Sequence, residues 1–529
     1  MNEPITAGTF AGMWRHVVEH SPDAPFLVFE RPDEQVVQWT YGEFDMAVSR
    51  AARFMASHGV IPTSAVHLAL TNSPTFVAVW LAAVRLGAWI VPSDPMSATP
   101  ELHGHISRTH PVIGFAAADR AATYRAALDD VSSAMPVVEI DEADGDLAVF
   151  GRTPLGPWPM PSPLDRAAVM FTSGTTGPPK GVEITQANYA FAGATMAGAC
   201  TLAAEHRQLV VLPMFHANAQ YYSFASAIAV GASVALMHTF SASRFLTQAA
   251  RHGATHASLF AAPIRMILAR GATPVPGVNL QHCWYAVNIS DDQYETLSSL
   301  LGCRPRQLYG MTETIPAVLT DHADAPVASS MGFVTAGCSV SVHRADGTEA
   351  APDEVGEIVV GGIPLLTLFA GYLDDPVTTE ASFRDGWFLT GDRATRDAAG
   401  RFRFDGRRAD VLKVAGENVS TVEVEQVLSA HPGVLEAAVV GQPDPIRDEV
   451  PVAFVVAADP ANPPALDELN AWCVERLTKS KRPRDITFVD ELPRTSVGKI
   501  RKFLLRDPDA ERSPERPATS ESERKHVSA

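Results

Sequence analysis

The sequence predicts an α/β protein: a large N-terminal domain of parallel-rich sheets covered by helices, followed by a small α+β domain. One observation is the alternation of strand-like and helix-like apolar segments. A strand-like run at 64–70 precedes a helix-like run at 76–84, which Pro74 opens. Alternating strands and helices are typical of parallel sheets with helices on their faces. The other observation is a change of pattern at 406–410, after which a compact unit of roughly 100 residues begins.

The N-terminal elements follow from hydrophobic periodicity. Apolar residues recur at helical spacing over 44–55 and predict a helix there. The segment 144–163 is rich in glycine and proline, so we expect a loop that leads into an apolar strand at 167–170. A second apolar strand is expected at 182–184, after a glycine-rich stretch.

The C-terminal part reads as a separate domain. Alternation over 402–405 predicts a hairpin strand before the boundary. Beyond it we expect helices at 422–430 and 465–477 and strands at 434–440 and 452–456. Ser420 and Glu423 form a capping-box pattern for the first of these helices. Residues 507–529 are charged and broken by prolines, which predicts a disordered tail.

Composition narrows the function classes. The formal net charge of −18 makes nucleic acid an unexpected partner, because phosphate backbones need a basic face. No apolar run approaches the roughly 18 residues of a membrane span, and no secretory signal is visible at the N-terminus. The cysteines show no CxxC or Cys/His spacing, which favours a reducing cytoplasm and argues against structural zinc; they are Cys200, Cys283, Cys303, Cys338 and Cys473.

The run 171–181 is the strongest chemical signal. It holds three glycines, four hydroxyl side chains and one lysine between the two apolar strands. Glycines let backbone N–H groups approach an anion, hydroxyls donate to phosphate oxygens and lysine adds a positive charge, so the run suits a polyphosphate. Only two residues separate Gly174 from Gly177, so this is not the P-loop spacing. The alternative is a mobile glycine-rich surface loop.

Five further motifs follow in order, at 307–314, 386–392, 405–413, 416–420 and 492–500. Together with the run 171–181 they resemble the adenylate-forming (AMP-binding) superfamily of acyl-CoA ligases, peptide-synthetase adenylation domains and luciferases. The resemblance extends from about Trp39 to Lys502. The segments 288–291 and 309–315 look most like the carnitine/crotonobetaine-type CoA ligases.

This resemblance implies a carboxylic acid–CoA ligase that uses ATP and Mg²⁺, forms an acyl-adenylate and transfers the acyl group to coenzyme A. For such chemistry the protein must hold the two anionic substrates together and stabilise the charge of the transition state. It does not need a nucleophile of its own. The resemblance also implies domains at 1–406 and 411–506, a hinge at 407–410 centred on Asp410, and a mobile C-terminal domain. The implied partners are the acid, ATP and coenzyme A, with no membrane span and a cytoplasmic location; a homodimer is one assembly the chain could form.

Roles for individual residues are carried over from the motifs. Thr312 is expected at the α-phosphate, and Glu313 is expected to bind Mg²⁺, a cation that prefers oxygen ligands. Tyr309 is expected beside adenine, Asp392 at both ribose hydroxyls and Arg407 at the ribose and phosphate. The expected contacts of the β- and γ-phosphates are Thr172, Ser173, Gly174, Thr175, Thr176 and Lys180. The alternatives are exposed turn residues for the charged groups and a core tyrosine for Tyr309.

The C-terminal domain is expected to serve two steps. Lys499 would bridge the attacking carboxylate and the α-phosphate during adenylation. After rotation about Asp410, Lys413 and Gly416 would face the large domain, and Gly416 would leave room for the pantetheine arm. The alternative readings are a solvated lysine and a plain surface turn.

An acyl pocket is expected where residues follow or flank the motifs that surround the adenylate. Its expected wall is Tyr221, Tyr222, Ala286 and Asn288, with His216 at its floor as a gate or orienting group. Aromatic rings there would hold a flat or cyclic acid, or a quaternary ammonium by cation–π contact. A lone histidine in an apolar stretch can equally be structural.

The chain departs from the family pattern at 284–290, where bulky side chains replace the usual small residues and put the adenine contacts in question. Gln186 also stands where a histidine is common. Three other functions therefore stay open. The chain could load a free-standing carrier protein, perform only one half-reaction, or bind a nucleotide without catalysis.

Overall fold

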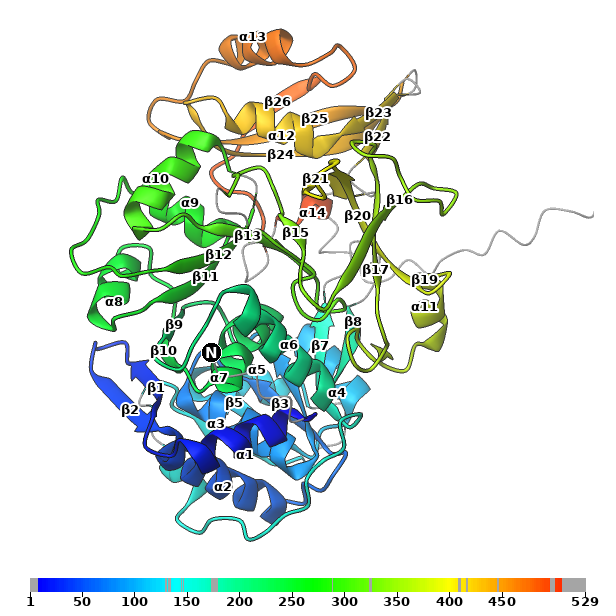
Figure 1. Cartoon of the computed structure of the whole chain (residues 1–529). Helices are drawn as coiled ribbons and strands as arrows, with labels where there is room; N and C mark the ends of the chain where they lie inside the picture. The colour runs from blue at the N-terminus through cyan, green and yellow to red at the C-terminus, as the bar shows by residue number, and fades with distance from the viewer. Residues whose placement is uncertain are drawn as a thin grey trace, which may run out of the picture. The chain divides into compact units, whose positions relative to one another are not determined.

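The computed structural model describes residues 8–506, except for 129–130, 132–134, 144, 146, 173–178, 288, 323–325, 408–410, 415–416, 445–446 and 495–499. The chain forms two compact units, Met1–Arg408 and Ala409–Ala529. Figure 1 shows mixed sheets and helices in both units, so the predicted α/β class is confirmed.

A seven-stranded sheet is formed mainly by the N-terminal half of the large unit (Figure 1). Its parallel strands, in chain order, are β3 (Ala65–Ala69), β4 (Trp89–Ser93), β5 (Ile113–Ala117), β6 (Val137–Ile140) and β7 (Arg166–Thr172). β8 (Lys180–Thr185) pairs with β7 in antiparallel orientation, and β18 (Gly371–Tyr372) pairs with β8. The glycine-rich run thus connects the two strands of a hairpin, β7 and β8.

A nine-stranded sheet follows, with its middle strands in green in Figure 1. Six neighbouring strands are parallel: β1 (Pro25–Glu30), β10 (Ser233–Met237), β9 (Arg207–Val210), β11 (His256–Phe260), β12 (His282–Ala286) and β13 (Arg306–Tyr309). The outer strands β2 (Val36–Thr40), β14 (Leu319–Thr320) and β15 (Phe333–Val334) are antiparallel.

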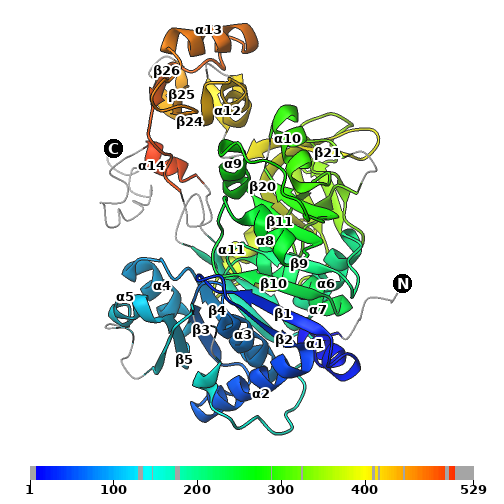
Figure 2. The ribbon, with the colours of Figure 1, turned by 90° about the vertical axis from the view of Figure 1, so that its left-hand side faces the viewer.

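Helices cover these sheets. Figure 2 shows α1, α2 and α3, which pack against one another, beside the first strands. The helices of the large unit are α1 (Phe10–His20), α2 (Tyr41–Ser57), α3 (Pro74–Leu86), α4 (Thr99–Thr109), α5 (Ala121–Ala126), α6 (Gln186–Ala199), α7 (Ser226–Val230), α8 (Phe245–Arg251), α9 (Ala261–Ala269), α10 (Asp291–Leu301) and α11 (Pro376–Ala381). Short helical turns are η1 (Ala118–Arg120) and η2 (Ala148–Phe150), and η3 (Asn218–Ala225) is a π-helix.

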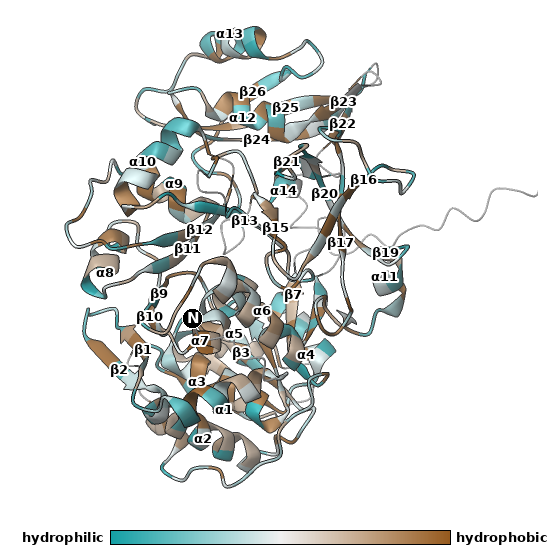
Figure 3. Cartoon of the chain, viewed as in Figure 1, coloured by the Kyte–Doolittle hydropathy of each residue, from teal (hydrophilic) through white to brown (hydrophobic). Residues whose placement is uncertain are grey.

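Pro74 opens α3 as expected, and two capping residues explain where the helix begins and ends. Ser73 accepts from the Phe76 backbone N–H, Pro74 occupies the first turn, and Gly87 closes the helix in the left-handed region. All but one of its residues are buried, and Figure 3 shows α3 largely in brown, whereas α10 is largely teal. Among the described residues, none of the helices has both the length and the apolar composition needed to cross a bilayer.

A five-stranded antiparallel sheet completes the large unit (Figure 1). It consists of β16 (Ser339–His343), β17 (Gly356–Gly361), β19 (Phe383–Arg384), β20 (Trp387–Arg396) and β21 (Phe402–Arg407). The hairpin strand predicted at 402–405 is the core of β21, which pairs with β20.

The small unit has its own core. Its elements are β22 (Val411–Val414), β23 (Glu417–Ser420), α12 (Thr421–Ser429), β24 (Val434–Asp444), β25 (Asp448–Ala457), α13 (Leu466–Arg476), β26 (Asp485–Phe488) and α14 (Lys502–Arg506). Ser420 caps α12 as expected, since its Oγ accepts from the Glu423 backbone N–H at 3.4 Å. The hairpin β24–β25 extends beyond the predicted strands because backbone pairing continues after the apolar alternation has ended. The tail 507–529 lies outside the described residues.

Candidate active site

Predicted site residues follow the ends of parallel strands. β9, β11, β12 and β13 are parallel neighbours, so their carboxyl ends meet at one edge of the sheet. Ala286 ends β12 in register with Phe260 of β11, and Tyr309 ends β13 just before Glu313. Ligands of open α/β sheets bind outside this edge. The topology therefore brings Ala286, Tyr309 and Glu313 to one region.

Asp392 is the centre of a first cluster. It lies on β20 opposite Arg407 of β21 and is only 3% exposed. The Tyr309 Oη donates to its Oδ2 at 2.8 Å, and the Arg407 Nε donates to its Oδ1 at 3.0 Å. Burial, together with the nearby Asp392 carboxylate, raises the pKa of Tyr309 well above its usual value, so its hydroxyl stays a donor. Three residues far apart in sequence thus meet.

The turn before Asp392 is supported from the neighbouring strand. Gly391 has φ +72°, a left-handed conformation that glycine adopts without strain. Its backbone N–H donates to the Glu357 Oε1 at 3.0 Å, and the Asp392 N–H donates to the Thr390 Oγ1 at 3.1 Å. These bonds fix the direction in which the Asp392 side chain leaves the strand.

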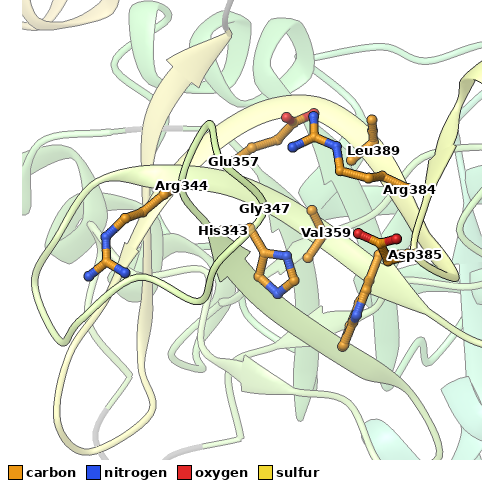
Figure 4. Close-up of a pocket in the computed structure, with 9 residues that line it drawn as sticks. His343, Arg344, Gly347, Glu357, Val359, Arg384, Asp385 and Leu389 are labelled. Carbon is orange, nitrogen blue, oxygen red and sulfur yellow. The ribbon is translucent and has the colours of Figure 1, made fainter.

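Glu357 also lines a cavity of about 80 Å³ on this sheet. Figure 4 shows the His343 ring inside it and the Arg344 side chain directed to the opposite side. The Arg384 Nη1 donates to the Ala345 carbonyl at 3.1 Å, and Trp387 lies 5.2 Å from His343 between ring centroids. None of the predicted site residues lines this cavity, so we assign no substrate to it.

Glu313 is the centre of a second cluster. Its side chain is buried and accepts from the Tyr372 Oη at 3.1 Å, while its carbonyl accepts from the Phe369 N–H at 3.1 Å. The Lys180 Nζ lies 4.7 Å from the centroid of the Tyr372 ring. Burial, with the nearby Glu313 charge, raises the pKa of Tyr372, so the phenol stays protonated. Tyr372 therefore links Lys180 to Glu313, and Thr312, which precedes Glu313 in the sequence, is half-exposed.

The donor set near Glu313 is compatible with Mg²⁺ carried by a nucleotide. In the described part of the chain, no group of three or more His, Cys, Asp or Glu residues could hold a metal by itself. Mg²⁺ is usually bound by one or two carboxylates together with substrate phosphates and water. One carboxylate, with a lysine close by for phosphate, meets that requirement.

The described ends of the phosphate loop lie side by side. Thr172 and Lys180 are register partners, and the Thr172 Oγ1 donates to the Lys180 carbonyl at 3.4 Å. Lys413 is on β22 of the small unit, where its backbone N–H donates to the Glu449 Oε2 at 2.9 Å. The other predicted residues of these segments lie outside the described residues; they are Ser173, Gly174, Thr175, Thr176, Asn288, Asp410, Gly416 and Lys499.

Two of the pocket candidates lie on a π-helix, an element that often marks functional sites. Tyr221 and Tyr222 are both on η3 and buried. The Tyr221 ring meets Tyr189 edge-on at 5.5 Å between centroids, inside the core. The Tyr222 hydroxyl lies 3.1 Å from where a Cβ on Gly310 would be, next to the turn that leads to Glu313. The Tyr222 hydroxyl is thus next to the turn between Tyr309 and Glu313, while burial and, to a smaller extent, the nearby Glu313 carboxylate raise the pKa of Tyr221.

His216 follows β9 in a segment that Asn72 holds. The Asn72 Oδ1 accepts from the Met214 N–H at 2.8 Å, and its Nδ2 donates to the carbonyls of Leu212 and Met237 at 3.1 Å each. His216 is half-buried, and its ring lies 4.5 Å from Phe215 between centroids. Asn72, in the turn between β3 and α3, therefore determines the path of the loop that carries His216.

Trp284 and Tyr285, the two largest side chains of the segment 284–290, do not crowd the strand end. Trp284 and Tyr285 point to opposite faces of β12 and belong to two separate apolar cores. The Tyr285 Oη donates to the Ala328 carbonyl at 3.1 Å, and the Gln307 Nε2 donates to the Val287 carbonyl at 2.9 Å. Ser290 already caps α10. Ala286 is the strand's last residue, so the volume of Trp284 and Tyr285 fills cores instead of the strand edge.

Tyr372 and Asn72 are the residues that sequence reasoning missed. Each stands alone in its segment, without a motif of charged or glycine residues that would mark a ligand contact. Tyr372 also lines a cavity of about 460 Å³ with acidic residues on its wall, namely Glu183, Asp374, Asp375 and Glu380. That charge is unsuited to a polyphosphate, so we do not place the nucleotide there.

Two known protein families match this chain. The AMP-binding enzyme family matches residues 14–373, and the AMP-binding enzyme C-terminal domain matches residues 423–499. The first match alone covers more than half of the chain.

Individual relatives match over nearly the whole length. A crotonobetaine/carnitine–CoA ligase of Citrobacter koseri is 31% identical over 514 residues, covering 93% of this chain and 98% of that protein. The structure of ATP-bound MatB from Rhodopseudomonas palustris has a TM-score of 0.83 at 25% identity, covering 94% and 99%. An anthranilate–CoA ligase, AuaEII, in complex with anthranoyl-AMP, shares the fold with a TM-score of 0.85 at 22% identity, covering 96% and 97%.

Proposed function

The chain belongs to the AMP-binding enzyme family, and we propose that it is a carboxylic acid–CoA ligase that forms an acyl-adenylate from ATP. The observation that carries the proposal is the arrangement of two clusters, Tyr309–Asp392–Arg407 and Lys180–Tyr372–Glu313. Only three residues separate Tyr309 from Glu313 in the sequence. A nucleotide that reaches from one cluster to the other would place its ribose and its phosphates on opposite sides of one short turn.

Asp392 supports the ribose part of this proposal. Each of its carboxylate oxygens already accepts one hydrogen bond, from Tyr309 or from Arg407. An ionised carboxylate has about four acceptor sites, so it can still accept from two hydroxyls of a cis-diol. The same two bonds hold the carboxylate in one orientation, so it need not reorganise when the nucleotide binds.

Lys180, Thr172 and Glu313 support the phosphate part. Lys180 and Thr172 would donate to the β- and γ-phosphates with Ser173, Gly174, Thr175 and Thr176, and Thr312 would contact the α-phosphate. Mg²⁺ held by Glu313 would neutralise charge on the phosphate oxygens. Tyr372 keeps both side chains in place, since it donates to Glu313 and offers its ring to Lys180.

The described cysteines make a protein thiol nucleophile unsuitable. Burial raises the pKa of Cys200 to about 12, of Cys338 to about 12 and of Cys303 to about 11, and it also raises the pKa of Cys283 and Cys473. A thiol is nucleophilic only as the thiolate. We therefore assign the attacking sulfur to coenzyme A.

The small unit supplies the remaining groups of the proposal. Lys499 would bridge the acid and the α-phosphate in the first step. Lys413 and Gly416 would face the pantetheine arm in the second, after rotation at Asp410 in the segment 407–410. The domain limits 1–406 and 411–506 belong to the same proposal.

The substrate acid is proposed only by class. The relatives named above act on crotonobetaine or carnitine and on anthranilate by their names. Tyr222, Ala286 and Asn288, with Tyr221 and His216, are our proposed pocket residues, and aromatic rings suit a quaternary ammonium or a flat acid. Both classes therefore belong in a substrate panel. We also propose a cytoplasmic location, and a homodimer is one assembly that the chain could form.

ATP–pyrophosphate exchange over a panel of acids, with and without coenzyme A, tests the proposal. We expect exchange with at least one acid and thioester formation when coenzyme A is added. Exchange without a thioester would favour loading of a carrier protein. Transfer from a supplied acyl-adenylate without exchange would favour an enzyme of a single half-reaction. The absence of both activities would favour a protein that binds a nucleotide without catalysis.

A further inference from the structure

Helix α4 contacts both described ends of the phosphate loop. Arg108, in the last turn of α4, has its Nη1 2.6 Å from the Pro179 carbonyl, to which it donates. The same guanidinium lies 5.1 Å from the centroid of the Phe171 ring. Phe171 precedes Thr172, and Pro179 precedes Lys180. One side chain therefore contacts the strand that enters the loop and the strand that leaves it.

His105, one turn earlier on α4, reinforces this contact. Its ring is stacked on Phe171 with centroids 4.0 Å apart and an angle of 11° between the planes. His105 and Arg108 are three residues apart, so they lie on the same face of the helix. α4 thus presents an aromatic ring and a cation to the end of β7.

A buried chain of hydrogen bonds anchors α4 to the sheet. The Tyr124 hydroxyl lies 2.8 Å from the His67 Nδ1, the His67 Nε2 lies 3.1 Å from the Ser93 Oγ, and the Ser93 Oγ lies 2.8 Å from the His105 Nδ1. These contacts form one consistent series of donors when both imidazoles are neutral: Tyr124 to His67, His67 to Ser93, and Ser93 to His105. All four side chains belong to residues at most 6% exposed. The nucleotide mechanism uses none of them.

Charge also connects Arg108 with the expected phosphate contact. The bond from Thr378, with the nearby charges of Lys180 and Arg108, lowers the pKa of the Asp375 carboxyl. Arg108 and Lys180 thus lie near the same carboxylate. An arginine suits this place because its planar guanidinium can stack on a ring and donate in-plane at once, which a lysine cannot.

We propose that Arg108 is a positioning residue for the adenylation step, with His105 as its support. By holding the Phe171 ring and the Pro179 carbonyl, it keeps Thr172 and Lys180 at the separation in which both can reach one phosphate group. The effect of Arg108 on adenylation rests on the proposed function. The contact of Arg108 with Phe171 and Pro179 can be tested in the absence of any ligand.

The test uses the full chain and the variants Arg108→Met and Arg108→Lys. Arg120→Met is a matched control, because Arg120 also donates to a proline carbonyl, that of Pro95, at 3.3 Å. Amide hydrogen exchange is measured without ligand on peptides that cover 166–185. The dissociation constant of ATP with Mg²⁺ is measured by calorimetry, and Tm is measured for every variant.

We expect Arg108→Met to speed exchange at the ends of β7 and β8 and to weaken ATP binding by about tenfold, as for loss of one bond from a charged donor. Tm and the KM for the acid should stay unchanged. The exchange rate and the ATP affinity of Arg108→Lys should lie between those of the unaltered chain and those of Arg108→Met. The control should match the unaltered chain. Faster exchange in a chain that binds no ATP would support the contact and refute the proposed function. The inference is overturned if Arg108→Met equals Arg120→Met in exchange and ATP affinity, or if ATP affinity falls only in step with Tm.

Discussion

At the scale of single residues, the candidate site consists of side chains whose partners hold them in one orientation. Asp392 receives one donor on each oxygen, and Glu313 receives the Tyr372 hydroxyl. A group held in this way stabilises charge without reorganisation during the reaction. Substitutions at this scale should therefore change catalysis more than stability.

Asp392→Ala and Glu313→Ala should each reduce ATP–pyrophosphate exchange by roughly 100-fold or more, the scale for loss of one organised electrostatic contact. The two should differ in their Mg²⁺ dependence, because only Glu313 is proposed to bind the metal. Glu295→Ala removes a carboxylate from an exposed pair with Arg304 and serves as the control, with less than about twofold change. Near-normal exchange in Asp392→Ala and Glu313→Ala would refute the site.

Tyr372 separates two contributions that Glu313→Ala removes together. Tyr372→Phe keeps the ring beneath Lys180 and loses the hydroxyl bond to Glu313, so the Mg²⁺ concentration needed for half-maximal exchange should rise. Tyr372→Leu also loses the ring, so the KM for ATP should rise as well, by about threefold for a contact of this kind. Identical kinetics for the two variants would show that the ring does not position Lys180.

The pocket prediction belongs to the same scale. Tyr222→Ala and Ala286→Trp should change the rank order of accepted acids in the exchange assay, because one enlarges and the other fills the proposed pocket. Exchange with the preferred acid should fall more than the affinity for ATP. An unchanged rank order in both variants would remove these two residues from the pocket.

At the scale of elements, the site depends on where strands and helices end. β7 and β8 form a hairpin that brings Thr172 opposite Lys180. β12 ends at the small residue Ala286, so the bulky Trp284 and Tyr285 are not at the edge of the sheet. The sheet of β3, β4 and β5 supports this hairpin through α4, with the buried His67 on β3 and His105 on α4. These histidines give the element a measurable pH dependence.

Burial lowers the pKa of His67 to about 3 and of His105 to about 4, below their usual value near 6.5. Below pH 6.5 the unfolded chain binds protons that the folded chain does not, so their contribution to stability is full above pH 6.5 and is lost as the pH falls towards 4. The slope is about 1.4 kcal/mol per pH unit for each histidine. The difference in unfolding free energy between the unaltered chain and His105→Gln should therefore shrink from pH 7 to pH 4. Urea unfolding at several pH values measures it, and a constant difference would contradict a neutral, buried His105.

At the scale of the whole molecule, the chain consists of two units that carry different parts of the proposed reaction. The large unit holds the Asp392 and Glu313 clusters, and the small unit holds Lys413, Gly416 and Lys499. A reaction in two steps can use two faces of one small domain if the domain rotates between them.

Lys499→Ala should abolish formation of the acyl-adenylate and leave transfer from a supplied acyl-adenylate to coenzyme A largely intact. Gly416→Leu should do the opposite by blocking the pantetheine path. Asp410→Pro restricts one backbone angle and should slow the second step without loss of a ligand contact. The two half-reactions are measured separately by pyrophosphate exchange and by thioester formation. Equal impairment of both steps in Lys499→Ala and in Gly416→Leu would contradict the two-conformation mechanism.

The sequence by itself determined the α/β class, the strands β24 and β25 of the small unit, the cap of α12 and the family, because these depend on local periodicity and on motifs contiguous in the chain. It also indicated Asp392, Glu313, Tyr309 and Lys180 as expected contacts of the nucleotide and its Mg²⁺. Only the tertiary structure decided their partners: that Tyr309 and Arg407 hold Asp392, that Tyr372 lies between Lys180 and Glu313, and that Trp284 fills a core. Arg108 and His105 likewise acquire a role only because α4 packs against the hairpin. The reason is that such contacts join residues tens to hundreds of positions apart, and the packing of sheets and helices, rather than any local pattern, sets the distance between them.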